Sequence, residues 1–130
     1  MPENFYVNTV GAVSSTKLSE AIELGKKLTA ESKAAGSERA SIGTIMTGNN
    51  AGSVVFQQFF NSLDDFANVM DAFATSSTYG KIMETGLKVT MRNVAKFCDV
   101  PFVAPENPTR KYVVLTRGSS HISQSELMDL

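Results

Sequence analysis

The stretch SVVFQQFFN (residues 53–61) runs directly into SLDDFANVMDAFA (residues 62–74), and this junction decides the fold. The apolar residues of the first part occupy both alternating sets, Val54, Phe56 and Phe60 on one side and Val55 and Phe59 on the other. Because successive side chains of a strand point to opposite faces, this alternation predicts a strand that is apolar on both faces. Such a strand needs cover on both sides of its sheet.

The second part of the stretch has the pattern of a capped amphipathic helix. Ser62 stands at the N-cap position and Asp65 follows three residues later, so the hydroxyl and the carboxylate can each bond an unpaired backbone N–H. Spacings of three and four predict one apolar stripe, formed by Leu63, Phe66, Ala67, Met70, Phe73 and Ala74. We expect the helix to pack through this stripe onto a sheet.

Three further strands are predicted by the alternation of apolar and polar residues, over residues 5–13, 39–47 and 87–97. Residues 48–52 begin and end with glycine, and glycine readily takes the positive φ that a tight loop requires. The strands on either side of this loop are therefore expected to be antiparallel neighbours.

Another helix is predicted over residues 17–35, where apolar residues recur on one stripe and Gly36 supplies the stop. Residues 75–78 are small hydroxyl residues that can cap a further short turn, with Tyr79 on its apolar side. The element order is then β, α, β, β, α, β. Two right-handed βαβ units in this order predict an α+β fold of the ferredoxin-like type, with a four-stranded antiparallel sheet and two helices on one face.

Length and charge limit what the chain can be. A chain of 130 residues fits one domain and can bury roughly two-thirds of its unfolded surface. We expect a ferredoxin-like domain over residues 1–97, and over residues 98–130 a Pro-rich connection with an arm strand at residues 111–117. The formal net charge is −1 with both signs interspersed, which argues against a nucleic-acid partner.

Cys98 is the single cysteine and His121 the single histidine. This composition excludes an intramolecular disulfide and metal sites built from cysteine or histidine clusters, and it fits a reducing cytoplasm, where we expect the protein. Residues 1–4 have neither a basic start nor an apolar run, so no secretion signal is expected. No apolar segment approaches the roughly 20 residues of a membrane span, and we expect no membrane partner, metal or cofactor.

The element order and the corner at residues 61–66, NSLDDF, resemble the dimeric α/β-barrel proteins of the ferredoxin-like fold. This superfamily includes small antibiotic-biosynthesis monooxygenases, haem-degrading monooxygenases and many uncharacterised members. The resemblance covers residues 5–97. It implies a homodimer in which two sheets pack face to face, as strands that are apolar on both faces require. It also implies that a ligand, where there is one, sits between the sheet and the helices or inside the barrel.

Haem degradation is not expected from this resemblance. Haem-degrading members use a histidine of the second helix as iron ligand, near a tryptophan and a first-strand asparagine. Asn8 stands in a comparable place, but the chain has no tryptophan, and Val69 and Met70 stand where the histidine would be. The chain is more similar to cofactor-independent, quinone-forming members, since Asn8, Tyr79 and Arg92 can orient a phenolic substrate or its anion. Tyr79 and Arg92 are therefore the catalytic candidates.

The residues expected to bind a ligand are Asn8, Gln58 and Arg92. Asn8 and Arg92 lie on strands that should be neighbours, on the more polar alternation, so both can point into one cavity. The alternative is that Arg92 pairs with a carboxylate and Asn8 bonds the backbone. Gln58 belongs to the same alternation as Phe56 and Phe60, and a buried glutamine needs a partner, whether protein, water or ligand.

Three functions are compatible with these features. The first is a homodimer whose packed sheets enclose a modest apolar cavity that binds a small apolar or aromatic metabolite. The second is a cofactor-independent monooxygenase-like enzyme acting on a phenolic or polyketide-like substrate. The third is a structural or interaction protein without a ligand, whose Pro-rich arm clasps a partner.

Overall fold

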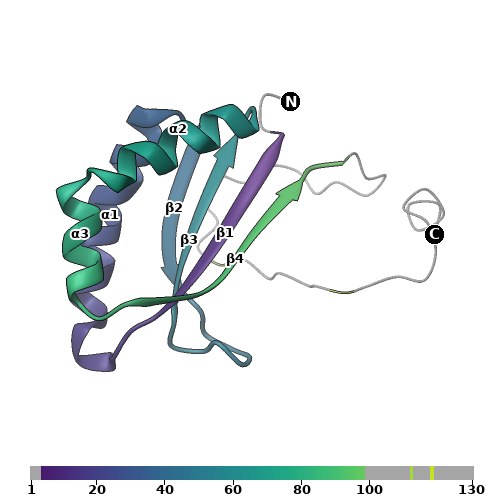
Figure 1. The fold of residues 1–130 in the computed structure, drawn as a ribbon. Coiled ribbons are helices and arrows are strands. Elements are labelled where there is room, and N and C mark those ends of the chain that lie inside the picture. Colours follow the sequence, from purple (N-terminus) through teal and green to yellow (C-terminus); the bar gives the residue numbers. More distant parts are fainter. Residues whose placement is uncertain (1–3, 99–111, 113–117, 119–130) are drawn as a thin grey trace. The chain divides into compact units, whose positions relative to one another are not determined.

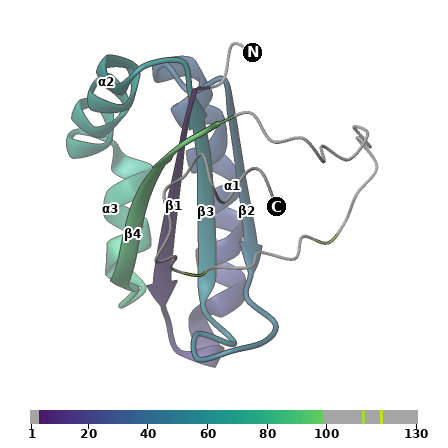
Figure 2. The same cartoon turned by 90° about the vertical axis from the view of Figure 1, so that its right-hand side faces the viewer.

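The computed structural model describes residues 4–98, 112 and 118 of the chain, and all of the described helices and strands lie in the compact unit Met1–Phe97. One antiparallel sheet runs in the order β2-β3-β1-β4 (Figures 1 and 2). Its strands are β1 (Phe5–Ala12), β2 (Arg39–Thr44), β3 (Val54–Phe60) and β4 (Lys88–Lys96). The predicted α+β, ferredoxin-like fold is confirmed by this strand order.

Three helices cover one face of the sheet, and no described helix lies on the other face (Figures 1 and 2). They are α1 (Leu18–Ala35), α2 (Leu63–Ala74) and α3 (Ser77–Glu84), and a 3₁₀ turn, η1 (Ser15–Lys17), precedes α1. The structure thus adds a helix, α3, to the two that were predicted. The Ser76 hydroxyl caps α3 by accepting a hydrogen bond from the Tyr79 amide at 3.2 Å.

The predicted helix ends are present, but the Asp65 carboxylate forms no hydrogen bond with a described residue. The Ser62 hydroxyl accepts a hydrogen bond from the Asp65 amide at 3.2 Å, which begins α2 directly after β3. At the end of α1, Gly36 has φ of 145° and its N–H donates to the Ser32 carbonyl at 3.1 Å. The chain therefore turns from α1 into β2 where the glycine permits it.

The register of the strands fixes which residues share a face. Phe56 of β3 lies opposite Thr9 of β1, and Thr9 lies opposite Arg92 of β4, all on the side of the helices. The preceding residue of β1, Asn8, lies opposite Gln57 of β3, and this pair is on the other face of the sheet. The prediction that the strand at residues 53–61 presents apolar residues on both faces is confirmed.

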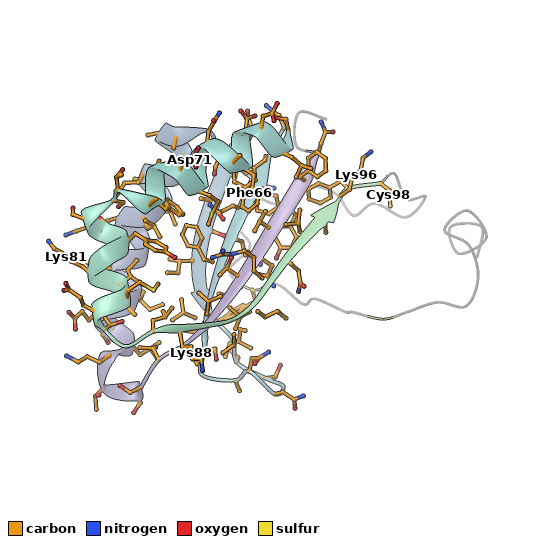
Figure 3. All side chains as sticks on the ribbon, viewed as in Figure 1. Phe66, Asp71, Lys81, Lys88, Lys96 and Cys98 are labelled. Carbon is orange, nitrogen blue, oxygen red and sulfur yellow. The ribbon has the colours of Figure 1, made fainter. Side chains whose placement is uncertain are left out.

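The core lies between the sheet and the helices. Its buried cluster consists of Val7, Leu28, Phe60, Val69, Phe73 and Ile82. In α2 the buried stripe differs from the predicted one, because Val69 is buried while Leu63 is 51% exposed and Ala67 is exposed. The ring of Phe66 packs edge-on against that of Phe60 from the sheet, with centroids 5.5 Å apart, and this contact sets the rotation of α2. Figure 3 shows Phe66 on the sheet side of α2, and Asp71 of the same helix is exposed.

The predicted Pro-rich connection after Cys98 and the predicted arm strand at residues 111–117 lie outside the described residues, apart from Tyr112, which is 74% exposed.

Candidate functional site

A cavity of about 60 Å³ lies between the sheet and the helices. All three helices and all four strands contribute to its wall. A single water molecule needs about 10–15 Å³ on the same measure, so the cavity has room for a few waters or for a small organic group. The cavity is therefore enclosed by residues of this chain alone, on the helix side of the sheet.

The lining of this cavity is mostly apolar. Its larger apolar side chains include Leu28, Phe56, Met70, Phe73, Ile82 and Met83. Polar side-chain atoms come from Thr9, Gln58, Tyr79 and Arg92. An apolar wall with a few placed polar groups is typical of sites for small organic ligands.

The cavity opens at β4, an edge strand of the sheet. Val89, which is 37% exposed, and Arg92 are exposed, whereas the other lining residues are buried or half-buried. The predicted site residue Arg92 thus stands at the mouth. Its Nε donates a hydrogen bond to the Thr9 hydroxyl at 3.1 Å, which fixes the direction of the guanidinium.

Arg92 forms no ion pair with a described residue. The ion pairs within residues 4–98 join Lys17 to Glu20 and Lys26 to Glu23, both on or next to α1. The alternative, in which Arg92 pairs with a protein carboxylate, is therefore not observed in the described part of the chain. This leaves its charge available to a ligand.

Tyr79 comes from α3 and is half-buried. Its ring stacks on that of Phe73, with centroids 5.6 Å apart and an angle of 18° between the planes. No described residue forms a hydrogen bond with the Tyr79 hydroxyl. The structure thus brings Tyr79, Gln58 and Arg92 to one cavity, as lining residues from three different elements.

Gln58 finds its partner within the protein. The side chain is 2% exposed, and its Nε2 donates to the Ser32 hydroxyl of α1 at 2.9 Å. The Ser32 hydroxyl is in turn hydrogen-bonded to that of Ser37. Because one donor of the Gln58 amide is bound in this way, the residue fixes α1 to β3 at the wall of the cavity.

Asn8 does not share the cavity with Arg92. The register pairs Asn8 with Gln57 and Asn93, which places it on the face without a helix, whereas Thr9 is the residue that meets Arg92. The expectation that Asn8 and Arg92 point into one cavity is corrected by this pairing. Asn8 is only 6% exposed, and its Oδ1 has no hydrogen-bond partner in the structure. A buried acceptor of this kind calls for a donor from outside the described contacts.

Two glycines of the wall were not among the predicted site residues. A Cβ at Gly25 of α1 would lie 1.8 Å from Ile42 Cδ1, and a Cβ at Gly11 of β1 would lie 2.6 Å from Leu87 Cδ2. The ends of Ile42 and Leu87 therefore occupy the space that larger residues would need. Glycine inside a helix lowers stability by about 1 kcal/mol relative to alanine. The presence of Gly25 within the predicted helix was therefore the sequence signal for a close contact at this position.

The described residues contain no group of three or more His, Cys, Asp or Glu side chains placed to hold a metal ion. None of the described helices has both the length and the apolar character needed to cross a membrane.

Several solved structures have folds similar to that of this chain. One is a dimeric ferredoxin-like protein from an uncultured marine organism, 16% identical, with a TM-score of 0.55, covering 75% of this chain and 96% of its own. Another is a nipsnap family protein of unknown function from Agrobacterium tumefaciens, 14% identical, with a TM-score of 0.57, covering 73% of this chain and 88% of its own. SnoaB, a cofactor-independent oxygenase from Streptomyces nogalater, is 12% identical, with a TM-score of 0.52, and the match covers 83% of this chain and 99% of SnoaB.

These likenesses confirm the ferredoxin-like fold. None of the curated proteins matches the sequence. A family model described as "Domain of unknown function (DUF6854)" matches residues 3–97, which span all of the described helices and strands. The chain therefore belongs to the DUF6854 family.

Proposed function

We propose that this protein is a homodimer that binds a small apolar or aromatic metabolite in the cavity between its sheet and its helices. The observation that carries the proposal is an apolar cavity that opens beside an arginine without an ion-pair partner among the described residues. Apolar walls favour an apolar ligand, and the few polar groups at the wall can orient it.

The helix-free face of the sheet supports the dimer. The ring of Phe59 lies 5.1 Å from that of Tyr6 and 6.1 Å from that of Phe97, centroid to centroid, and Phe97 is 41% exposed. A second copy of the same face would supply apolar contacts to these rings. A structure with a similar fold is also described as dimeric.

Native mass spectrometry of protein purified from its own host tests both parts of this proposal. We expect a dimer that carries extra mass, and release of that mass should identify a small organic molecule. A monodisperse monomer at micromolar concentration would contradict the dimer. An empty dimer that also fails to bind indole or phenol in a calorimetric titration would contradict the ligand.

The second candidate is a cofactor-independent oxygenase acting on a phenolic or polyketide-like substrate. It is favoured by the presence of both Tyr79 and Arg92 in the wall of one cavity. SnoaB, whose fold is similar, is a cofactor-independent oxygenase. Arginine can hold a phenolate and tyrosine can exchange a proton with it, so the two side chains suit such a substrate.

Oxygen consumption with a panel of phenolic probes, in metal-free buffer and without added cofactor, tests the second candidate. We expect consumption by the native protein and a loss of about 10²-fold or more in the variants Tyr79→Phe and Arg92→Gln, in line with the usual effect of removing an acid–base group. Equal rates in the native protein and in both variants would show that these residues are not catalytic.

A further inference from the structure

We propose that the ligand of this cavity is a monocarboxylic acid, whose carboxylate binds Arg92 at the mouth and whose apolar part extends inward to a depth set by Gly25. This inference rests on the proposed ligand-binding function and adds the chemical class of the ligand.

The charge at the mouth selects an anion. Arg92 is the one charged residue among those that line the cavity within the described part of the chain. Its Nε donates a hydrogen bond to the Thr9 hydroxyl at 3.1 Å, and the guanidinium forms no other hydrogen bond or ion pair with a described residue. The two terminal amino groups therefore remain for a ligand, and their parallel N–H bonds match the two oxygens of a carboxylate.

The interior selects a ligand with one polar end. Behind Arg92 the polar groups of the wall are Thr9, Gln58 and Tyr79, and the Gln58 amide already donates to Ser32. A doubly charged head group such as a phosphate monoester would leave part of its charge without a partner, because a single arginine serves the site. A carboxylate followed by an apolar chain or ring satisfies both the arginine and the apolar wall.

The depth of the cavity depends on the contact between α1 and β2. Ile42 lines the cavity, and its Cδ1 lies where a Cβ of residue 25 would be, 1.8 Å from that position. An alanine at residue 25 would have to displace the end of the Ile42 side chain, since two carbon atoms cannot approach so closely. Part of the displaced side chain would then take up cavity space that the ligand uses.

The carboxylate is tested with hexanoate and the matched neutral compound hexanamide, by calorimetric titration and by chemical shifts of the backbone amides. We expect hexanoate to bind about ten-fold or more tightly than hexanamide, because hydrogen bonds to charged groups are stronger. Arg92→Gln should remove this preference. Lys88→Gln should preserve it, because Lys88 is an exposed cation at the start of the same strand and does not line the cavity (Figure 3).

The depth is tested with Gly25→Ala and a series of straight-chain acids from butanoate to hexanoate, whose apolar chains match the size of the cavity. We expect the affinity for hexanoate to fall about ten-fold while that for butanoate is unchanged, since a lost buried CH₂ contributes about 0.8 kcal/mol and two are displaced. Gly80→Ala in α3 is the matched control, because a Cβ there meets no atom within 4 Å. Combining Gly25→Ala with Ile42→Val removes the clashing methyl group and should restore hexanoate binding.

The possible results separate this inference from the function on which it rests. Equal binding of hexanoate and hexanamide, both shifting the Thr9 and Leu87 amides, would overturn the carboxylate and leave the cavity as a ligand site. If neither compound shifted those amides at millimolar concentration, the inference and the proposed ligand would both be wrong. A loss of butanoate and hexanoate binding to the same extent in Gly25→Ala would overturn the role of Gly25.

Discussion

The hydrogen-bonded cluster of Ser32, Ser37 and Gln58 is the main polar feature of the described interior. All three side chains are buried, with exposures between 0% and 6%. Gln58 donates to Ser32, and the two serine hydroxyls bond each other, so the cluster joins α1, the segment after it and β3. A buried polar group that loses its partner costs more free energy than the bond itself contributes. The cluster therefore fixes the position of α1 over the sheet, and with it the width of the cavity.

At this scale we predict that Ser32→Ala lowers the free energy of unfolding by about 1–3 kcal/mol, because the Gln58 amide and the Ser37 hydroxyl each lose a partner. Urea unfolding at fixed protein concentration measures the change. Ser19→Ala, at an exposed position of the same helix, should change stability by less than about 0.5 kcal/mol. Equal losses in the two variants would show that the cluster contributes nothing to stability.

Among the elements, α3 is the one that local patterns identified least well. Its eight residues begin with Ser77 and Thr78, which favour turns, so the sequence predicted only a short capped turn. Contacts made by its apolar side stabilise it as a helix, since Ile82 is buried in the core and Tyr79 stacks on Phe73 of α2. A helix this short is marginal on its own, and tertiary packing decides whether it forms.

Ser76 anchors α3 in two ways, since its hydroxyl accepts from the Tyr79 amide and donates to Glu31 Oε1 of α1 at 2.6 Å. We predict that Ser76→Ala lowers stability by about 0.5–2 kcal/mol and speeds hydrogen exchange at the Tyr79 amide. Ser77→Ala is the matched control, because the Ser77 hydroxyl forms no hydrogen bond with a described residue. Unchanged exchange at Tyr79 in Ser76→Ala would show that packing alone holds this turn.

The candidate site was predictable within each strand but not between strands. Alternation correctly grouped Gln58 with Phe56 and Phe60, and the structure places this group toward the helices. Alternation could not predict that Arg92 lies opposite Thr9 instead of Asn8. Which residues of two neighbouring strands lie opposite each other depends on the register of the strands. Register is fixed by the whole sheet, including a shift between Val10 and Gly11, and a single sequence carries no direct record of it.

At the scale of the whole molecule, the sheet separates two surfaces of different character. The helix side encloses the small apolar cavity, whereas the other side carries the rings of Tyr6, Phe59 and Phe97. Arg39 adds a cation 4.1 Å from the centroid of the Phe59 ring. Phe97 is 41% exposed, whereas Tyr6 and Phe59 are half-buried. Aromatic groups gathered on one face are typical of contact surfaces between proteins. We therefore assign ligand binding to one side and self-association to the other, as parts of the proposed function.

The assignment of the helix-free face predicts that Phe97→Asp weakens dimerisation, because a carboxylate would be buried among aromatic rings. Light scattering coupled to size-exclusion chromatography should show a dimer for the native protein and a monomer for this variant at about 10 μM, a concentration at which an interface that has lost a few kcal/mol dissociates. Leu63→Asp is the control, since Leu63 is 51% exposed on α2, away from this face. Dimers of equal strength in the two variants would place the interface elsewhere.

Strand β1 belongs to both surfaces at once. Thr9 holds the arginine at the cavity mouth, and its neighbours Asn8 and Val10 point to the opposite face. A shift of the backbone at Thr9 on ligand binding is therefore also a shift of the surface on which subunits would meet. Thermodynamic linkage then requires that a ligand strengthen or weaken association by the same factor by which association changes the affinity for the ligand. The fraction of protein in the dimer would then depend on the concentration of the metabolite, because β1 contributes residues to both surfaces.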